Sequence, residues 1–175
     1  MRPGSHVVTS VLEHNSVLRP LAHRVHDLGV AVTRLGVNAD GVLDPDELTR
    51  SLRADTSLVA LTHASNVAGS IQPVEELAEA AARAGVPLLL DAPQSVGAVE
   101  ICHRRLPGRV FVAFSGHKRL LAPPGVGGLI VPDRELPQTV VGGTGVRSES
   151  ELHPPELPLR HEAGTPNLPG FRHAF

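Results

Sequence analysis

A short stretch in the middle of the chain decides the fold, and it reads VPLLLDAPQS over residues 86–95. Its first five residues are apolar throughout, which is typical of a strand that is covered on both faces. A polar group that includes Asp91 and Gln94 follows without a break. We therefore expect a buried strand over residues 86–90 that presents these two side chains at its carboxyl end.

The flanking sequence repeats this rhythm of strand and helix. Further strands are predicted at 6–10, 30–35, 58–62, 110–114 and 126–131, and helical patterns lie between the first four of the six predicted strands. One pattern runs from Val17 to Leu28 and is followed by Gly29, while Asp44 and Pro73 open two others. The alternation predicts an α/β domain with a mainly parallel sheet and helices on both faces. From about residue 132 the chain is too rich in Gly and Pro for regular structure to be expected.

Composition excludes several classes of protein. The chain has 175 residues, 41% of them hydrophobic, and a net charge of −2, so no strong field attracts nucleic acid or an anionic membrane. No apolar run approaches the roughly 20 residues that span a bilayer. The single cysteine excludes a disulfide framework and a Cys-rich zinc module. No signal segment is evident, so a cytoplasmic location is expected. With four Phe and no Tyr or Trp, the core must consist of Val, Leu and Ala.

The 16 basic residues include a single lysine, Lys118. Arginine stays protonated, whereas a lysine can lose its proton and act as an amine nucleophile. A bias in composition that left one lysine over is the alternative explanation.

Polar side chains follow four of the predicted strands, and ligands bind at the carboxyl ends of strands in open α/β sheets. We expect them to meet at one edge of the sheet: His14, Asn66, Asp91, Gln94, Ser115, His117 and Lys118. Each has an ordinary explanation when taken alone, as a helix N-cap for Asp91, a surface histidine for His14, a turn residue for Asn66 or solvated loop residues for His117 and Lys118. His23 and His26 lack a third ligand, so no metal site is predicted.

Pyridoxal 5'-phosphate (PLP) is a cofactor that would use all of these groups. A lysine amine forms a Schiff base with an aldehyde, and a carboxylate keeps the pyridine nitrogen protonated. Lys118 and Asp91 suit these two roles, and His14 could stack on the ring. Asn66 and Gln94 could bind the ring hydroxyl, and Ser115 and His117 the phosphate.

The same residues lie in motifs that extend from about residue 6 to residue 170. These are EHNSVLRPL (13–21), HASNVAG (63–69), DAPQSVG (91–97), SGHK (115–118), GGTG (142–145) and EAGTPN (162–167). As an ordered set they resemble the class V aminotransferase family, and within it the cysteine desulfurase-like branch.

The resemblance implies a PLP-dependent enzyme of fold type I that works as a homodimer with shared sites. Lys118 would be the Schiff-base lysine and His14 the stacking residue, with Asp91 on the pyridine nitrogen. Thr165 would reach the phosphate site of the partner subunit. The substrate would be an amino acid, and the reaction desulfuration, selenocysteine cleavage or transamination.

Members of this family are much longer. The resemblance implies that residues 1–135 are the central part of the large PLP-binding domain, incomplete at both ends, and that residues 136–175 lead towards a small C-terminal domain. Cys102 does not match the persulfide-forming cysteine of desulfurases. A truncated, non-catalytic PLP-binding or dimerisation fragment is therefore an alternative, and an unrelated α/β binding domain is a third.

Overall fold

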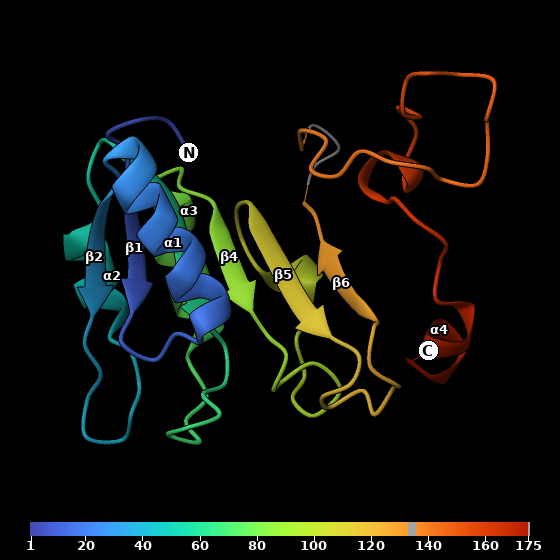
Figure 1. Ribbon diagram of the computed structural model, residues 1–175. Helices are drawn as coiled ribbons and strands as arrows, with labels where there is room; N and C mark the ends of the chain where they lie inside the picture. The colour runs from blue at the N-terminus through green and yellow to red at the C-terminus, as the bar shows by residue number, and fades with distance from the viewer. Residues whose placement is uncertain (133–135, 175) are drawn as a thin grey trace.

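A six-stranded sheet forms the centre of the molecule in the computed structural model, which describes residues 1–132 and 136–174. The spatial order of the strands is β2-β1-β3-β4-β5-β6. Their bounds are His6–Ser10 (β1), Ala31–Leu35 (β2), Thr56–Thr62 (β3), Leu88–Asp91 (β4), Val110–Ser115 (β5) and Gly127–Ile130 (β6). All neighbouring pairs are parallel except β5 and β6, which are antiparallel. The predicted mainly parallel α/β sheet is confirmed (Figure 1).

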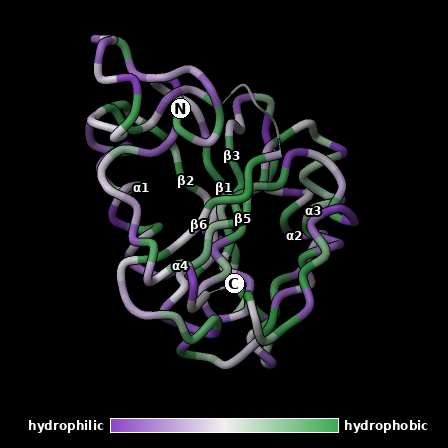
Figure 2. Tube along the Cα trace, turned by 90° about the vertical axis from the view of Figure 1, so that its right-hand side faces the viewer, coloured by the Kyte–Doolittle hydropathy of each residue, from purple (hydrophilic) through white to green (hydrophobic). Residues whose placement is uncertain are grey.

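Three helices cover the two faces of the sheet: α1 (Asn15–Leu28), α2 (Pro45–Ser51) and α3 (Val74–Arg83). Figure 2 shows α1 on one side of the strands and α2 and α3 on the other. Local sequence explains two of the boundaries. Asp44 caps α2 by accepting a hydrogen bond from the Asp46 N–H. Gly29 ends α1 at φ 62°, a left-handed conformation that a glycine adopts without strain.

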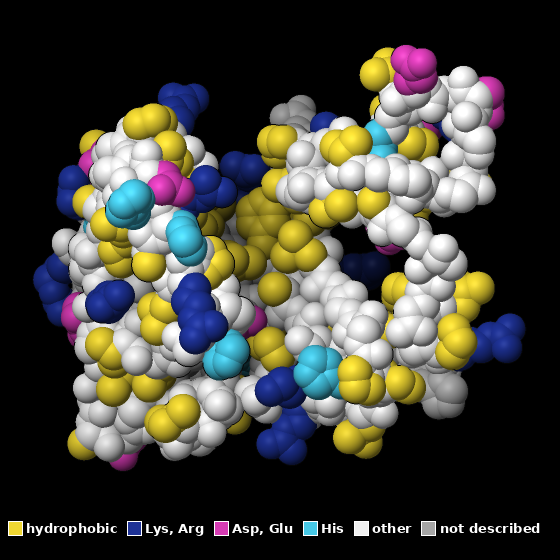
Figure 3. Space-filling view, in the orientation of Figure 1, with side chains coloured by type: hydrophobic (Ala, Val, Ile, Leu, Met, Phe, Trp, Pro, Cys, Tyr) yellow, Lys and Arg dark blue, Asp and Glu magenta, His cyan; other side chains and the backbone are white. Residues whose placement is uncertain are grey.

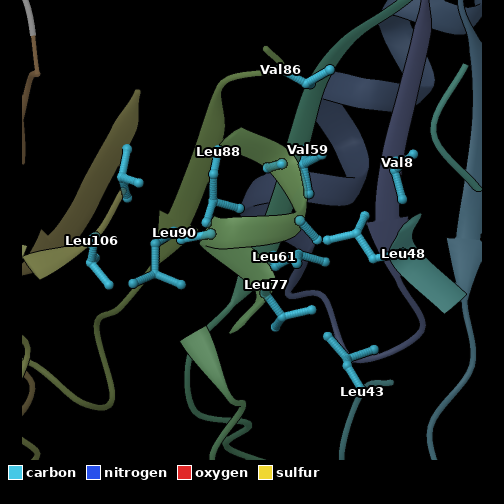
Figure 4. Close-up of a cluster of buried hydrophobic side chains, with 14 of the residues drawn as sticks. Val8, Leu43, Leu48, Val59, Leu61, Leu77, Val86, Leu88, Leu90 and Leu106 are labelled. Carbon is cyan, nitrogen blue, oxygen red and sulfur yellow. The ribbon is translucent and has the colours of Figure 1, made fainter. Parts of the chain in front are cut away.

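The main core lies between the sheet and the pair α2 and α3, and most of its side chains are drawn in Figure 4. A smaller cluster of Val7, Leu21 and Val30 lies under α1. Val7 and Val8 fall in different clusters because successive strand residues point to opposite faces of the sheet. Among the described residues, the buried hydrophobic side chains are Val, Leu and Ala only, as the composition predicts.

The structure corrects three expectations. β4 spans 88–91 instead of 86–90, so Asp91 is itself a strand residue and pairs with Thr62 and Ala113. The residues after it form turns, so Asp91 is not the N-cap of a helix. The C-terminal tail contains the short helix α4 (Leu168–Ala174), where irregular structure was expected, because a proline is tolerated in a first helical turn. The expected boundary at residue 135 lies outside the described residues.

Candidate active site

A cavity of about 310 Å³ lies at the carboxyl ends of β3, β4 and β5, next to the start of α1. Histidine and basic side chains lie on this part of the surface (Figure 3). The lining residues are His14, Ser16, Thr62, Ala64, Asn66, Asp91, Pro93, Gln94, Ser115, His117 and Lys118. Seven of the eight site residues proposed from the sequence are in this group, and Thr165 is not. Parallel strands bring these side chains together because their carboxyl ends meet at one edge of the sheet.

Asp91 supplies the carboxylate of the cavity. It occupies the last ladder position of β4, between Thr62 of β3 and Ala113 of β5, and its main-chain oxygen accepts a hydrogen bond from the His63 N–H at 2.9 Å. Partial burial raises the pKa of Asp91, while Lys118, and His14 when its ring is protonated, act in the opposite direction. The strand ladder therefore fixes a carboxyl group within electrostatic reach of the lysine amine and the imidazole.

His14 has two structural roles at the rim of the cavity. It is the N-cap of α1, and its Nδ1 accepts a hydrogen bond from the Ser16 N–H at 3.1 Å. Nδ1 also lies 2.9 Å from Ser16 Oγ. Because Nδ1 is an acceptor, the neutral ring carries its proton on Nε2. The ring is exposed, so the expectation of a surface histidine at a helix start is also correct.

Lys118 lies in a tight loop after β5. The Gly116 N–H donates to the Val126 oxygen at 2.8 Å, and the Ala122 N–H donates to the Gly116 oxygen at 3.0 Å. These bonds close the loop around an exposed Lys118 side chain that lines the cavity.

The loop after β4 packs directly against this lysine loop. At Gly97, where φ is +89°, an added Cβ would lie 3.1 Å from the Arg119 oxygen and 2.9 Å from Leu120 Cδ2. Only glycine combines that backbone conformation with that close approach. The position of Lys118 therefore depends on a contact between the two motifs that carry Asp91 and the lysine.

The two glycine-containing motifs of the tail lie against each other. The Gly164 N–H donates to the Gly143 oxygen at 2.7 Å. Thr165, next to Gly164, is exposed and does not line the cavity. Its expected role concerns a partner subunit, so it stays a prediction.

Sequence reasoning named no role for Glu13, although it opens the first motif. Its side chain is 7% exposed, and burial raises its pKa to about 7. Ser16 and Thr62 lie in the polar stretches at the strand ends but were also given no role, although both line the cavity. Their positions, two residues after His14 and at the last position of β3, are the only signals that could have indicated them.

Within residues 1–132 and 136–174, no group of three or more His, Cys, Asp or Glu side chains is placed to hold a metal ion. No helix in the same ranges has the length and apolar character needed to cross a membrane.

Comparisons with known proteins agree with one another. The chain is 34% identical over 168 residues to the cysteine desulfurase IscS of Dictyoglomus turgidum. The aligned region covers 96% of this chain and 39% of the relative. It is 37% identical over 175 residues to a probable cysteine desulfurase of Methanothermobacter thermautotrophicus, with 97% and 43% covered. The chain thus spans less than half the length of these curated relatives.

Solved structures give the same picture. The apo structure of a cysteine desulfurase from Thermococcus onnurineus superposes with a TM-score of 0.86 at 32% identity, covering 99% of this chain and 44% of that one. The cysteine desulfurase CsdA of Escherichia coli superposes with a TM-score of 0.84 at 28% identity. The family described as aminotransferase class-V matches residues 1–173. The chain belongs to the class V aminotransferase family.

Proposed function

We propose that this chain forms the PLP-binding core of an enzyme that acts on an amino acid, of the cysteine desulfurase or selenocysteine lyase type. The observation that carries the proposal is the cavity that an amine, a carboxylate and an imidazole line together. The names of the relatives support the substrate class. A homodimer with shared sites is part of the same proposal, as is a cytoplasmic location.

The donor set of the cavity fits PLP. Its volume of about 310 Å³ lies at the lower end of the range for small-molecule sites. Asp91 would bind the pyridine nitrogen, His14 would lie against the ring, and Asn66 and Gln94 would bind the ring oxygen. Ser115 and His117 would hold the phosphate, because a hydroxyl and an imidazole N–H are both donors.

The cofactor, when bound, supplies an aldehyde that reacts with amines and a protonated ring that withdraws electrons. The residues of the chain supply the rest. Lys118 would bind the aldehyde carbon through Nζ until the amine of the amino acid takes its place, and the released Nζ would then move a proton at the α carbon as general acid and base. Asp91, whose ionised form the nearby Lys118 amine favours against the effect of burial, would hold the proton of the pyridine nitrogen.

The binding step can be tested with purified protein. PLP is added, the visible absorbance band is recorded, and the sample is reduced with borohydride and mapped by mass spectrometry. Because Lys118 is the only lysine, the other amine in the chain is the N-terminus. We expect the pyridoxyl group on Lys118 and its loss in Lys118→Arg, which keeps the positive charge. Label at the N-terminus alone would contradict the proposal.

The alternative function is that of a non-catalytic PLP-binding or dimerisation fragment. Sulfide release after addition of L-cysteine separates the two functions. Release that depends on Lys118 would support the enzyme, whereas labelling of Lys118 without release would support the fragment.

A further inference from the structure

Glu13 lies behind the wall of the cavity, where it joins two strands of the sheet. Its Oε1 accepts a hydrogen bond from the Ser10 hydroxyl at the end of β1, at 2.5 Å. The same oxygen accepts from the Thr62 N–H at the end of β3, at 3.0 Å. Thr62 lines the cavity and is paired with Asp91. His14, which also lines the cavity, directly follows Glu13 in the chain. Glu13 therefore contacts or adjoins three strand or helix ends that build the site.

The other carboxyl oxygen of Glu13 is in a different situation. Oε2 is buried and has no hydrogen-bond partner among the described residues. A buried charge without a partner is very unfavourable, whereas a neutral carboxyl group in the same place costs much less. A proton on Oε2 would remove the charge and leave both hydrogen bonds at Oε1 in place, because a protonated acid keeps its carbonyl oxygen as an acceptor.

Burial favours the neutral form of both Glu13 and Asp91, and the surrounding charges then act differently on the two acids. Asp91 on β4 is the acid that acts on Glu13, and its negative charge favours the neutral form of Glu13. His14 and Lys118 act on Asp91 and favour its ionised form. His63 on β3 is buried, and burial favours its neutral form. Two nearby acids in a partly buried site have the lowest free energy when only one of them is ionised.

We propose that Glu13 is a positioning residue, a neutral carboxyl group that fixes Thr62 and the start of α1 against the cavity and leaves the negative charge on Asp91. The part of this proposal that concerns cofactor binding rests on the proposed function. Burial also raises the pKa of Glu13 to about 7, so the neutral form predominates below that pH.

Two substitutions separate the position of Glu13 from its charge. Glu13→Gln keeps an acceptor oxygen for Ser10 and Thr62 and cannot ionise, so it imitates the proposed neutral form. Glu13→Ala removes the acceptor and leaves both donors unpaired. Glu47→Gln removes a half-buried carboxyl that accepts from the Gly36 N–H, and it gives the baseline for a loss of one negative charge elsewhere.

The first measurement needs no cofactor. The carboxyl carbons of the full chain, labelled with ¹³C-glutamate, are followed by NMR against pH, and the Glu13 signal is assigned by its absence in Glu13→Gln. We expect its midpoint near the raised pKa of about 7. A midpoint near the ordinary value of 4.5 would overturn the proposal, whatever the variants do.

The second measurement is the affinity for PLP, from the absorbance titration at pH 6.5. We expect Glu13→Ala to bind about tenfold more weakly than the wild type and Glu13→Gln to restore the affinity. Equal weakening in both variants would show that a carboxylate is needed and would overturn the proposal. If the wild type does not bind PLP, the proposed function fails, and the NMR titration still decides the protonation of Glu13. If Glu13→Ala does not fold, the PLP affinity of Glu13→Gln and the NMR titration decide whether the proposal for Glu13 holds.

Discussion

The two roles of His14 can be separated by substitution. His14→Ala removes both the N-cap of α1 and the ring at the cavity. His14→Asn removes the ring only, because asparagine is among the best N-cap residues and can accept from the Ser16 N–H in place of Nδ1. We expect the alanine variant to lose both stability and PLP affinity, and the asparagine variant to lose affinity alone.

The magnitudes follow from the contacts. Loss of an N-cap costs about 1 kcal/mol of unfolding free energy. In a domain of this size that lowers the melting temperature by roughly 2–4 °C. A stacked aromatic ring contributes about 0.5–1.5 kcal/mol beyond its buried area, which corresponds to a loss of affinity of roughly two- to tenfold.

Thermal unfolding followed by circular dichroism measures the first effect, and the absorbance titration with PLP measures the second. The reasoning about the cap is refuted if His14→Asn loses as much stability as His14→Ala. The reasoning about the ring is refuted if His14→Asn binds PLP as tightly as the wild type.

Three other predictions concern stability and the lysine loop. His6 is fully buried, with ring nitrogens 2.8 and 2.9 Å from two threonine hydroxyls, and burial lowers its pKa below 6.5. Its contribution to the unfolding free energy is therefore complete above pH 6.5 and is lost as the pH falls below it. His6→Gln should make the unfolding free energy, measured in urea titrations at several pH values, depend less on pH. An unchanged pH dependence would contradict this role of His6. Gly97→Ala should lower the unfolding free energy by at least about 1 kcal/mol and reduce the borohydride labelling of Lys118, because the added Cβ would meet the Arg119 oxygen. Normal labelling and stability would contradict the packing of the two loops. Leu61→Ala should cost about 2–5 kcal/mol in chemical denaturation, since the side chain is 1% exposed in the main core, and a loss below about 1 kcal/mol would show that the cluster is not the core.

Local signals in the sequence were sufficient for much of the fold. Asp44 and Gly29 mark helix ends because a side-chain cap and a left-handed residue act within a few positions of the chain. The apolar run before Asp91 predicted a buried strand for the same reason. Seven of the residues that line the cavity could be named in advance because they lie at or just after the ends of strands, and parallel strands end at one edge.

Tertiary structure decided what depends on residues far apart in the sequence. The antiparallel direction of β6 and the placement of Asp91 within β4 are set by pairing partners in other strands. The need for glycine at position 97 arises from the backbone of another loop. The raised pKa of Glu13 is not visible in its motif, because it comes from burial between two strands and from the charge of Asp91. Burial and through-space charge arise only once distant segments pack together, so no local pattern encodes them.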